Sequence, residues 1–164
     1  MRRIFFAVTL VVACALGAAA GPIEDADSAY QRGDYALAAQ LYRPLAEQGN
    51  AEAQRLLGAI YYAGQGVSQD YQEAAKWYRK AAQQGNADAQ LILGVMYRNG
   101  QGVSHDLVRS YMWLNLAATA VRGDSMKYAE KSLNTVASRM TAAQIGKAQA
   151  MARRCQQTKF KECD

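Results

Sequence analysis

The chain has 164 residues, of which 51% are hydrophobic and 20% charged, and its formal net charge is +5. This length suits one domain, and the apolar content is enough to bury a core, so the chain need not be disordered. Alanine is abundant, and β-branched residues are sparse beyond the first dozen positions. Because alanine loses least in a helix and β-branched residues lose rotamer freedom there, the composition predicts helices.

Residues 1–20 have the layout of a secretory signal peptide. Arg2 and Arg3 form a basic start, an apolar run covers Ile4–Leu16, and three alanines ending at Ala20 offer a cleavage site. The apolar run is short for a membrane span, and no later segment approaches the ~20 residues that spanning requires. We therefore expect a periplasmic or secreted protein after cleavage near Ala20, without a transmembrane span.

Cys14 leaves a second processing route open, because Val11–Cys14 loosely resembles a bacterial lipoprotein box. Cleavage there would leave a lipid on Cys14 and anchor the protein. A small apolar residue inside the signal peptide is the favoured interpretation, since the alternative leaves a very short apolar core and a better cleavage site lies downstream.

Charge is unevenly distributed along the remaining chain. Residues 21–90 carry a net charge of −3 and residues 91–164 carry +6. A basic C-terminal half could contact an anionic partner, but a solvated face with cations near helix C-termini is favoured. No aromatic-interleaved basic motif accompanies the charge, and this, together with export, argues against nucleic acid as a partner.

After a leading helix and linker predicted over residues 21–33, the chain repeats itself with an offset of 36 residues. Agreement this dense predicts two structural units, residues 34–69 and 70–105. The stretches that coincide are Asp34-Tyr35 with Asp70-Tyr71, Ala38-Ala39 with Ala74-Ala75, Gly49-Asn50-Ala51 with Gly85-Asn86-Ala87, Leu57-Gly58 with Leu93-Gly94, Tyr61 with Tyr97, and Gly64-Gln65-Gly66-Val67-Ser68 with Gly100-Gln101-Gly102-Val103-Ser104.

Each unit is predicted to contain two helices. In the second unit, Asp70 caps the first helix, and Glu73 completes a capping box with it. Gly85 ends this helix with a positive φ, and Asn86 caps a second helix that runs to about Asn99. Helical spacing predicts buried faces at Ala74, Tyr78, Ala81 and Ala82 of the first helix and at Ala89, Leu93, Met96 and Tyr97 of the second.

Gly58 and Gly94 occupy the same mid-helix place in the two units, where glycine costs ~1 kcal/mol relative to alanine. A cost repeated at one place predicts that a neighbouring helix approaches closely there. Two helices cannot bury their apolar faces alone, so the pairs are expected to stack. The predicted fold is all-α, a right-handed α-solenoid of antiparallel helix pairs with a C-terminal capping helix.

The repeated residues resemble the unit of the Sel-1-like repeat family, a relative of the tetratricopeptide repeat. The family pattern is similar to A-x-x-W-Y-x-x-A-A-x-x-G-x-x-x-A-x-x-x-L-G-x-x-Y-x-x-G-x-G-V. The resemblance implies a solenoid that serves as a scaffold in envelope assembly, secretion, signalling or host interaction. Among the residues that fill the pattern are Trp77, Tyr78, Gly85, Leu93, Gly94, Tyr97, Gly100 and Gly102.

Residues 106–140 are predicted to form a divergent third unit, in which Trp113 falls on Trp77. The register slips by two residues at Val121–Asp124, and the later helix lacks the mid-helix glycine, as expected of a terminal unit that faces water. The two tryptophans could be stacking platforms for a glycan or a peptide. Their shared place in the repeat favours a role in the interface between helices.

Residues 141–164 are predicted to form a capping helix, started by a capping box of Thr141 and Gln144, and a tail. Cys155 and Cys163 remain after export into an oxidising compartment, so the pair is predicted to form a disulfide. Metal binding is the rival interpretation, but two thiols without nearby histidine or carboxylate ligands make a poor site. No metal and no cofactor are expected.

No catalytic arrangement stands out, and we expect the protein not to be an enzyme. Glu47 and Glu52 flank a turn without a third acid beside them. His105 takes the place of Gln69 in the preceding unit, which favours a surface role over that of a catalytic base. Ser104 belongs to the repeated loop and to no nucleophile elbow. Some family members linked to β-lactam hydrolysis carry a disulfide in each unit, which this chain lacks.

The expected function is that of an exported protein–protein interaction scaffold of the bacterial cell envelope, with a protein partner of unknown identity. The alternative is an envelope protein that binds peptidoglycan or exopolysaccharide through exposed tyrosines and the basic C-terminal half. Solenoids present extended surfaces suited to docking, but a fold alone does not fix a function.

Overall fold

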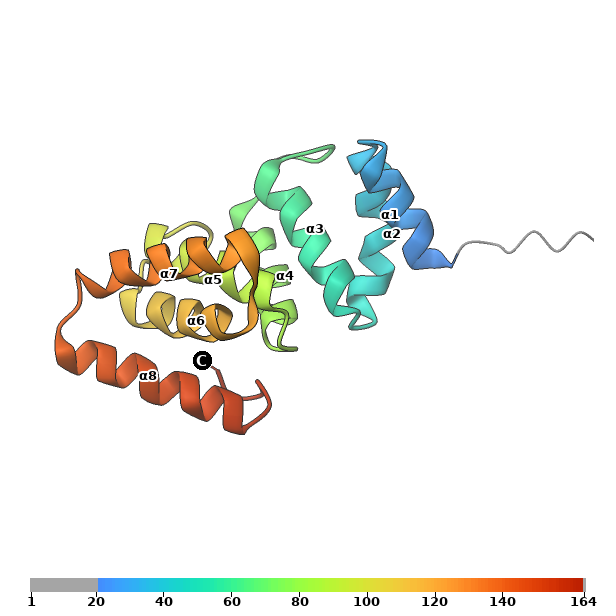
Figure 1. Ribbon diagram of the computed structural model, residues 1–164. Coiled ribbons are helices and arrows are strands. Elements are labelled where there is room, and N and C mark those ends of the chain that lie inside the picture. Colours follow the sequence, from blue (N-terminus) through green and yellow to red (C-terminus); the bar gives the residue numbers. More distant parts are fainter. Residues whose placement is uncertain (1–20, 164) are drawn as a thin grey trace, which may run out of the picture.

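The computed structural model describes residues 21–163, which form a row of helices joined by short loops (Figure 1). The predicted signal peptide of residues 1–20, with Cys14 and Ala20, lies outside the described residues. The helices are α1 (Pro22–Gln31), α2 (Tyr35–Glu47), α3 (Ala51–Ala63), α4 (Tyr71–Ala82), α5 (Ala87–Asn99), α6 (Leu107–Ala120), α7 (Gly123–Ala137) and α8 (Ala142–Gln157).

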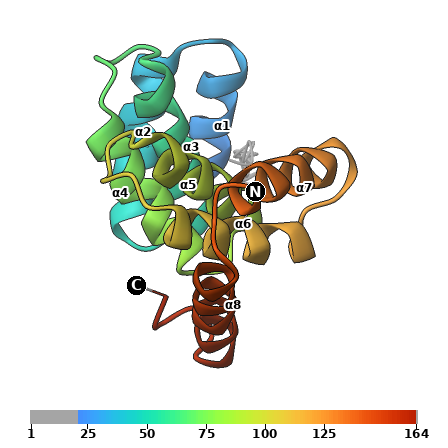
Figure 2. The ribbon, with the colours of Figure 1, turned by 90° about the vertical axis from the view of Figure 1, so that its left-hand side faces the viewer.

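Successive helices pack against one another from α1 to α7, and the contacts are most extensive between α3 and α4 and between α5 and α6. The last helix departs from this order, because α8 packs mainly against α6. Figures 1 and 2 show α7 and α8 on different sides of α6. None of the helices within residues 21–163 has the length and apolar character needed to cross a membrane.

Side-chain caps explain where most helices begin. A cap side chain accepts a hydrogen bond from a backbone N–H of the first turn, which has no partner within the helix. The capping box predicted for Thr141 and Gln144 is confirmed at the start of α8. The cap residues of α2 to α6 are Asp34, Asn50, Asp70, Asn86 and Asp106.

The second half of the capping box predicted at Asp70 is wrong. The Asp70 carboxylate accepts two N–H bonds of α4, as expected, but its own backbone N–H donates to the Tyr61 carbonyl at 3.0 Å. No donor is then left for the Glu73 side chain. The Glu73 carboxylate accepts from Trp77 Nε1 at 3.2 Å and from Lys76 Nζ at 2.9 Å instead.

The apolar faces predicted for the second unit are buried, which confirms the helical spacing argument. Two neighbouring clusters form the core: one joins α1, α2 and α3 to Trp77, and the other extends from α4 to the tail. The predicted core residues that are buried are Ala74, Tyr78, Ala81, Ala82, Ala89, Leu93, Met96 and Tyr97.

The two mid-helix glycines mark close helix approaches, as predicted. A Cβ atom added at Gly94 of α5 would lie 2.8 Å from Leu114 Cγ of α6. At Gly58 of α3, an added Cβ would lie 3.2 Å from the Tyr78 ring of α4. Glycine therefore lets each helix lie directly against the first helix of the following unit.

The leading helix α1 corresponds to the second helix of a unit. Tyr30 and Gly33 at its end have the spacing of Tyr61 and Gly64 at the end of α3. Both glycines have positive φ, 79° and 66°. By the predicted division into units, α1 thus takes the place of a second helix.

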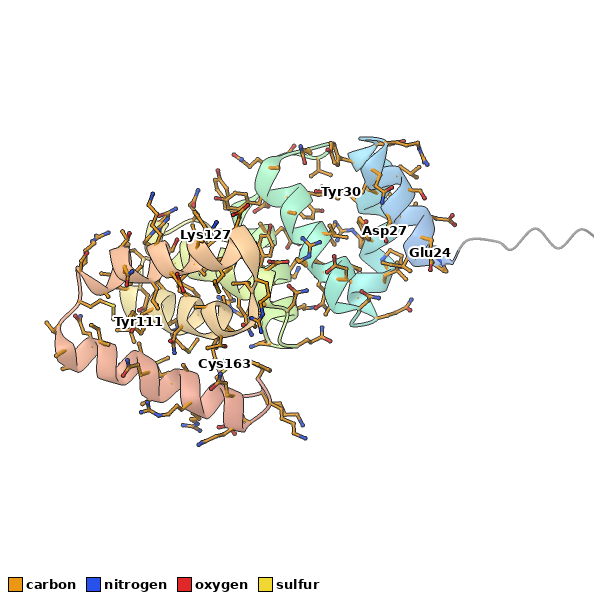
Figure 3. The ribbon with its side chains drawn as sticks, viewed as in Figure 1. Glu24, Asp27, Tyr30, Tyr111, Lys127 and Cys163 are labelled. Carbon is orange, nitrogen blue, oxygen red and sulfur yellow. A yellow bond between two sulfur atoms is a disulfide. The ribbon has the colours of Figure 1, made fainter. Side chains whose placement is uncertain are left out.

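Two acidic residues of α1 stand where α3 has apolar or small residues. In this register, exposed Asp25 takes the place of Leu56, which is buried. Asp27 takes the place of Gly58, and its Oδ1 accepts a hydrogen bond from the Tyr42 hydroxyl at 2.6 Å. Burial, together with this hydrogen bond, raises the pKa of Tyr42 above its usual value. Figure 3 shows Asp27 and Tyr30 on α1.

Candidate functional site

A groove of about 640 Å³ lies along α4, the end of α5 and the start of α6. Three cationic side chains line it, and the described lining residues include no acidic side chain. Its volume is within the range of about 300–1,000 Å³ that is usual for ligand pockets. The lining residues are Gln72, Ala75, Lys76, Arg79, Tyr97, Gly100, Gly102, Val103, Ser104 and Arg109.

Two of the cations are held by neighbours on α4 and α5. Lys76 Nζ donates to Glu73 Oε1 at 2.9 Å and lies 5.4 Å from the centre of the Trp77 ring. Arg79 Nη2 donates to the Tyr97 hydroxyl at 2.9 Å, and its guanidinium lies 6.0 Å from the centre of that ring. These contacts fix the positions of both charged groups at the wall of the groove.

The third cation comes from the first turn of α6. Arg109 Nη1 donates to Asp106 Oδ2 at 2.8 Å, and the Arg109 backbone N–H donates to Asp106 Oδ1 at 2.9 Å. Burial by itself would raise the pKa of Asp106, but the hydrogen bonds from Arg109 outweigh it and lower that pKa. Asp106 thus stays ionised as the cap of α6 and holds the guanidinium in place.

The cation cluster is specific to this junction. One unit earlier, Arg43 also bonds to a tyrosine hydroxyl, that of Tyr61, and lies over its ring. The counterparts of Lys76 and Arg109 at that place, 36 residues earlier, are Gln40 and Glu73. The arginine–tyrosine pair therefore belongs to the repeat, whereas Lys76 and Arg109 are additions.

The two tryptophans are core residues with different hydrogen bonding. Trp77 is 2% exposed and donates through Nε1 to Glu73 on the preceding turn. Trp113 is fully buried, and its Nε1 has no hydrogen-bond partner among the described residues. The place of Glu73 is taken by Arg109, which has no acceptor to offer.

The other repeat residues hold the groove together. Gly100 ends α5 with a φ of 68°, and its N–H donates to the Met96 carbonyl. A Cβ at Gly102, whose φ is also 68°, would lie 1.8 Å from the Tyr71 carbonyl oxygen at the start of α4. The loop after α5 therefore lies directly on α4, and this contact forms one end of the groove.

The disulfide closes the C-terminal tail. Cys155 of α8 is bonded to Cys163, and both residues are buried. Figure 3 shows Cys163 beyond the end of α8, on the side that faces α6. The tail also reaches Gly85 at the end of α4, where an added Cβ would lie 3.0 Å from the Phe160 ring. Gly85, whose φ is 84°, therefore both follows the end of α4 and contacts the tail.

The residues considered for catalysis do not come together. Glu52 pairs with Arg55, whose hydrogen bond is the main cause that lowers the pKa of this carboxyl group. His105 and Glu47 are exposed. Within residues 21–163, histidine, cysteine and acidic side chains form no group of three or more that could hold a metal ion.

Sequence reasoning missed the groove as a site. Lys76 and Arg109 lie 33 residues apart and in different predicted units, so no local pattern singled them out. The repeat register contains a signal that could have found them. Comparison with Gln40 and Glu73 at the equivalent places shows two substitutions toward positive charge at one junction.

The sequence profile of the Sel1 repeat matches residues 26–50, 51–86 and 87–120. The predicted units 34–69, 70–105 and 106–140 are offset from these matches by one helix, and that division stays a prediction. A search of curated proteins found no match.

The solved structures similar to this chain include two Sel1-like repeat proteins. One is c5321, a protective antigen present in uropathogenic Escherichia coli strains displaying an SLR fold. Its sequence is 31% identical to this chain, and the two structures superpose with a TM-score of 0.73 over 86% of this chain and 30% of the c5321 chain. The other is a Sel1 repeat protein from Oxalobacter formigenes, 41% identical, with a TM-score of 0.54 over 58% of this chain and 28% of its own. This chain therefore spans less than a third of either structure. The likeness confirms the all-helical solenoid fold.

Proposed function

Because the chain belongs to the Sel1 repeat family, we propose that it is an exported protein–protein interaction scaffold of the bacterial cell envelope. Sel1 repeat proteins are typically protein–protein interaction scaffolds. The observation that carries the proposal for this chain is the groove along α4, α5 and α6, which gathers Lys76, Arg79 and Arg109 without an acidic side chain in its described lining. Arginine is enriched where proteins bind each other.

Export is supported by the predicted signal peptide and by the Cys155–Cys163 disulfide, which favours an oxidising compartment. Mass spectrometry of the protein isolated from the envelope tests the processing route. We expect an N-terminus at Gly21 after cleavage behind Ala20. A lipid-bearing N-terminus at Cys14 would instead indicate a protein anchored to the membrane.

Binding without catalysis is proposed because the described lining of the groove includes neither a histidine nor an acid that could act as a base. The decisive experiment is crosslinking of the tagged protein in its native envelope, followed by mass spectrometry of what it retains. One dominant protein partner, lost when residues lining the groove are changed, supports the scaffold. Capture of no protein under these conditions contradicts it.

A peptidoglycan or exopolysaccharide binder is the second candidate, and one observation favours it. The helix α8 and the tail expose the cations Lys147, Arg153, Lys159 and Lys161. Retention on purified peptidoglycan or on an anionic polysaccharide, released by salt, would support this role, because exposed charge pairs are screened by salt. Retention of wall fragments in the crosslinking experiment, without a protein, points the same way.

A further inference from the structure

We propose that the groove binds an acidic peptide segment of the partner, and that Lys76 and Arg109 are the residues that select it. This inference rests on the proposed scaffold function and names the chemistry of the partner.

The first argument is the charge of the groove. Lys76, Arg79 and Arg109 line it, and the nearest acids, Glu73 and Asp106, are engaged in the structure. Glu73 accepts a hydrogen bond from Trp77 and pairs with Lys76, while Asp106 caps α6 and pairs with Arg109. Three cations against these two acids leave the wall of the groove with a net positive charge. Arginine and lysine recognise carboxylates through charge-assisted hydrogen bonds, which are about twice as strong as neutral ones.

The second argument is the choice of residue at position 109. In the preceding unit, Glu73 satisfies the indole N–H of Trp77 at a distance of 3.2 Å. Arg109 at the equivalent place leaves the buried Nε1 of Trp113 without a partner among the described residues. A buried donor without an acceptor is destabilising. A residue that breaks a local rule at the expense of stability is typical of functional sites.

The third argument concerns the class of partner. Beside the cations, the groove presents the amide of Gln72 and the hydroxyl of Ser104, which can both donate and accept hydrogen bonds. It also presents the half-buried apolar side chain of Val103. A peptide offers carboxylates, backbone amides and apolar side chains together. A phosphate ion offers charge and hydrogen-bond acceptors, and a uronic acid polymer offers carboxylates and hydroxyls, but neither carries apolar side chains beside the charge, so an acidic peptide fits the lining best.

The experiment measures binding of a short fluorescein-labelled peptide of alternating glutamate and alanine by anisotropy, using the purified protein with its disulfide intact. A peptide of alternating glutamine and alanine is the matched probe. We expect the acidic peptide to bind, its affinity to fall with salt, and the glutamine peptide to bind at least tenfold more weakly.

The variants Lys76→Gln and Arg109→Glu introduce the residues that the preceding unit carries at the same places, Gln40 and Glu73. Each should weaken binding of the acidic peptide about tenfold. Lys127→Gln on α7 is the control, because Lys127 is also an exposed lysine paired with an acid three residues earlier (Figure 3). It should leave binding unchanged.

Stability separates the two effects of Arg109→Glu. Glutamate at this place can accept from Trp113 Nε1, as Glu73 does from Trp77, but it gives up the ion pair with Asp106, so the melting temperature should change little while binding falls. Equal binding of the two peptides, no binding of the acidic peptide, or full binding by both groove variants would overturn the proposal. So would equal competition by inorganic phosphate or polygalacturonate. If the crosslinked partner in cells survives both groove variants, the scaffold stands and the groove assignment fails.

Discussion

Alanine substitutions at three helical glycines test whether close helix packing selects glycine in the repeat. Gly146 in α8 has no atom within 4 Å of an added Cβ. Gly146→Ala should therefore show the helix propensity gain alone and stabilise the protein by about 0.5–1 kcal/mol. The same gain applies to Gly58 and Gly94, where contacts of the new methyl group oppose it.

The structure ranks the two repeat glycines. At Gly94 the methyl group would lie 2.8 Å from Leu114 Cγ and 3.1 Å from the Leu114 backbone nitrogen, so α6 itself must move. Overpacking of this kind costs about 1–3 kcal/mol, and Gly94→Ala should be destabilising by about 1–2 kcal/mol net. At Gly58 the contacts are with the Tyr78 ring at 3.2 Å, which can yield, so a net change on the order of 0.5 kcal/mol is expected.

Urea and thermal unfolding of the three variants give the order of stability, since 1 kcal/mol shifts the melting temperature of a chain this size by roughly 2–4 °C. A double-mutant cycle with Leu114→Ala adds a direct check, because removal of the leucine side chain should lessen the effect of Gly94→Ala. If Gly94→Ala is as stable as Gly146→Ala, close approach of α5 and α6 is not what requires glycine.

Three further changes have expected outcomes. Reduction of the Cys155–Cys163 bond should add two hydrogens to the intact mass and lower stability by about 2–3 kcal/mol, as seen in unfolding with and without reductant. Tyr42→Phe should cost about 1–3 kcal/mol by removing the donor to Asp27. Because the pKa of Tyr42 is raised in the folded protein, the stability that this group contributes should be complete below the usual tyrosine pKa of about 10 and should fall as pH rises above it. In thermal melts at a series of pH values, the phenylalanine variant should lose less stability than the wild type over that range. Asn86→Ala should cost about 1 kcal/mol in urea unfolding by removing the cap of α5, and Asn86→Asp should restore most of it.

Most helix ends could be predicted from the sequence because they depend on short-range bonds. Asn86 bonds to the N–H three residues later, and Gly85 ends the preceding helix through its own conformation. Both signals lie within one turn of the helix end, so no knowledge of the tertiary structure is needed. Repetition strengthened them, since Gly49 and Asn50 occur at the same place one unit earlier.

The features that the sequence did not predict depend on contacts between residues far apart in the chain. Glu73 does not complete the capping box because the carbonyl of Tyr61, on the preceding helix, already accepts the N–H of Asp70. The packing of α8 on α6, and of Phe160 against Gly85, depends on how the divergent last unit turns the chain. No local pattern records that direction.

The groove falls between these two cases. The burial of Trp77 and Trp113 follows from their shared place in the repeat, and the sequence predicted it. The cation cluster arises from helix packing that brings Lys76 and Arg109 to one wall. Only a comparison of equivalent positions between units, rather than of neighbours along the chain, identifies these two residues as exceptional.

The polar residues of α1 bear on where another repeat could be added to this chain. Asp25 is exposed where the equivalent place of α3 has buried Leu56, so a unit packed over this part of α1 would have to cover a carboxylate. Inside the array, each helix pair already matches its neighbours on both sides. Insertion of a second copy of residues 51–86 should therefore yield a longer folded protein, whereas units added ahead of Pro22 should not join the same cooperative transition.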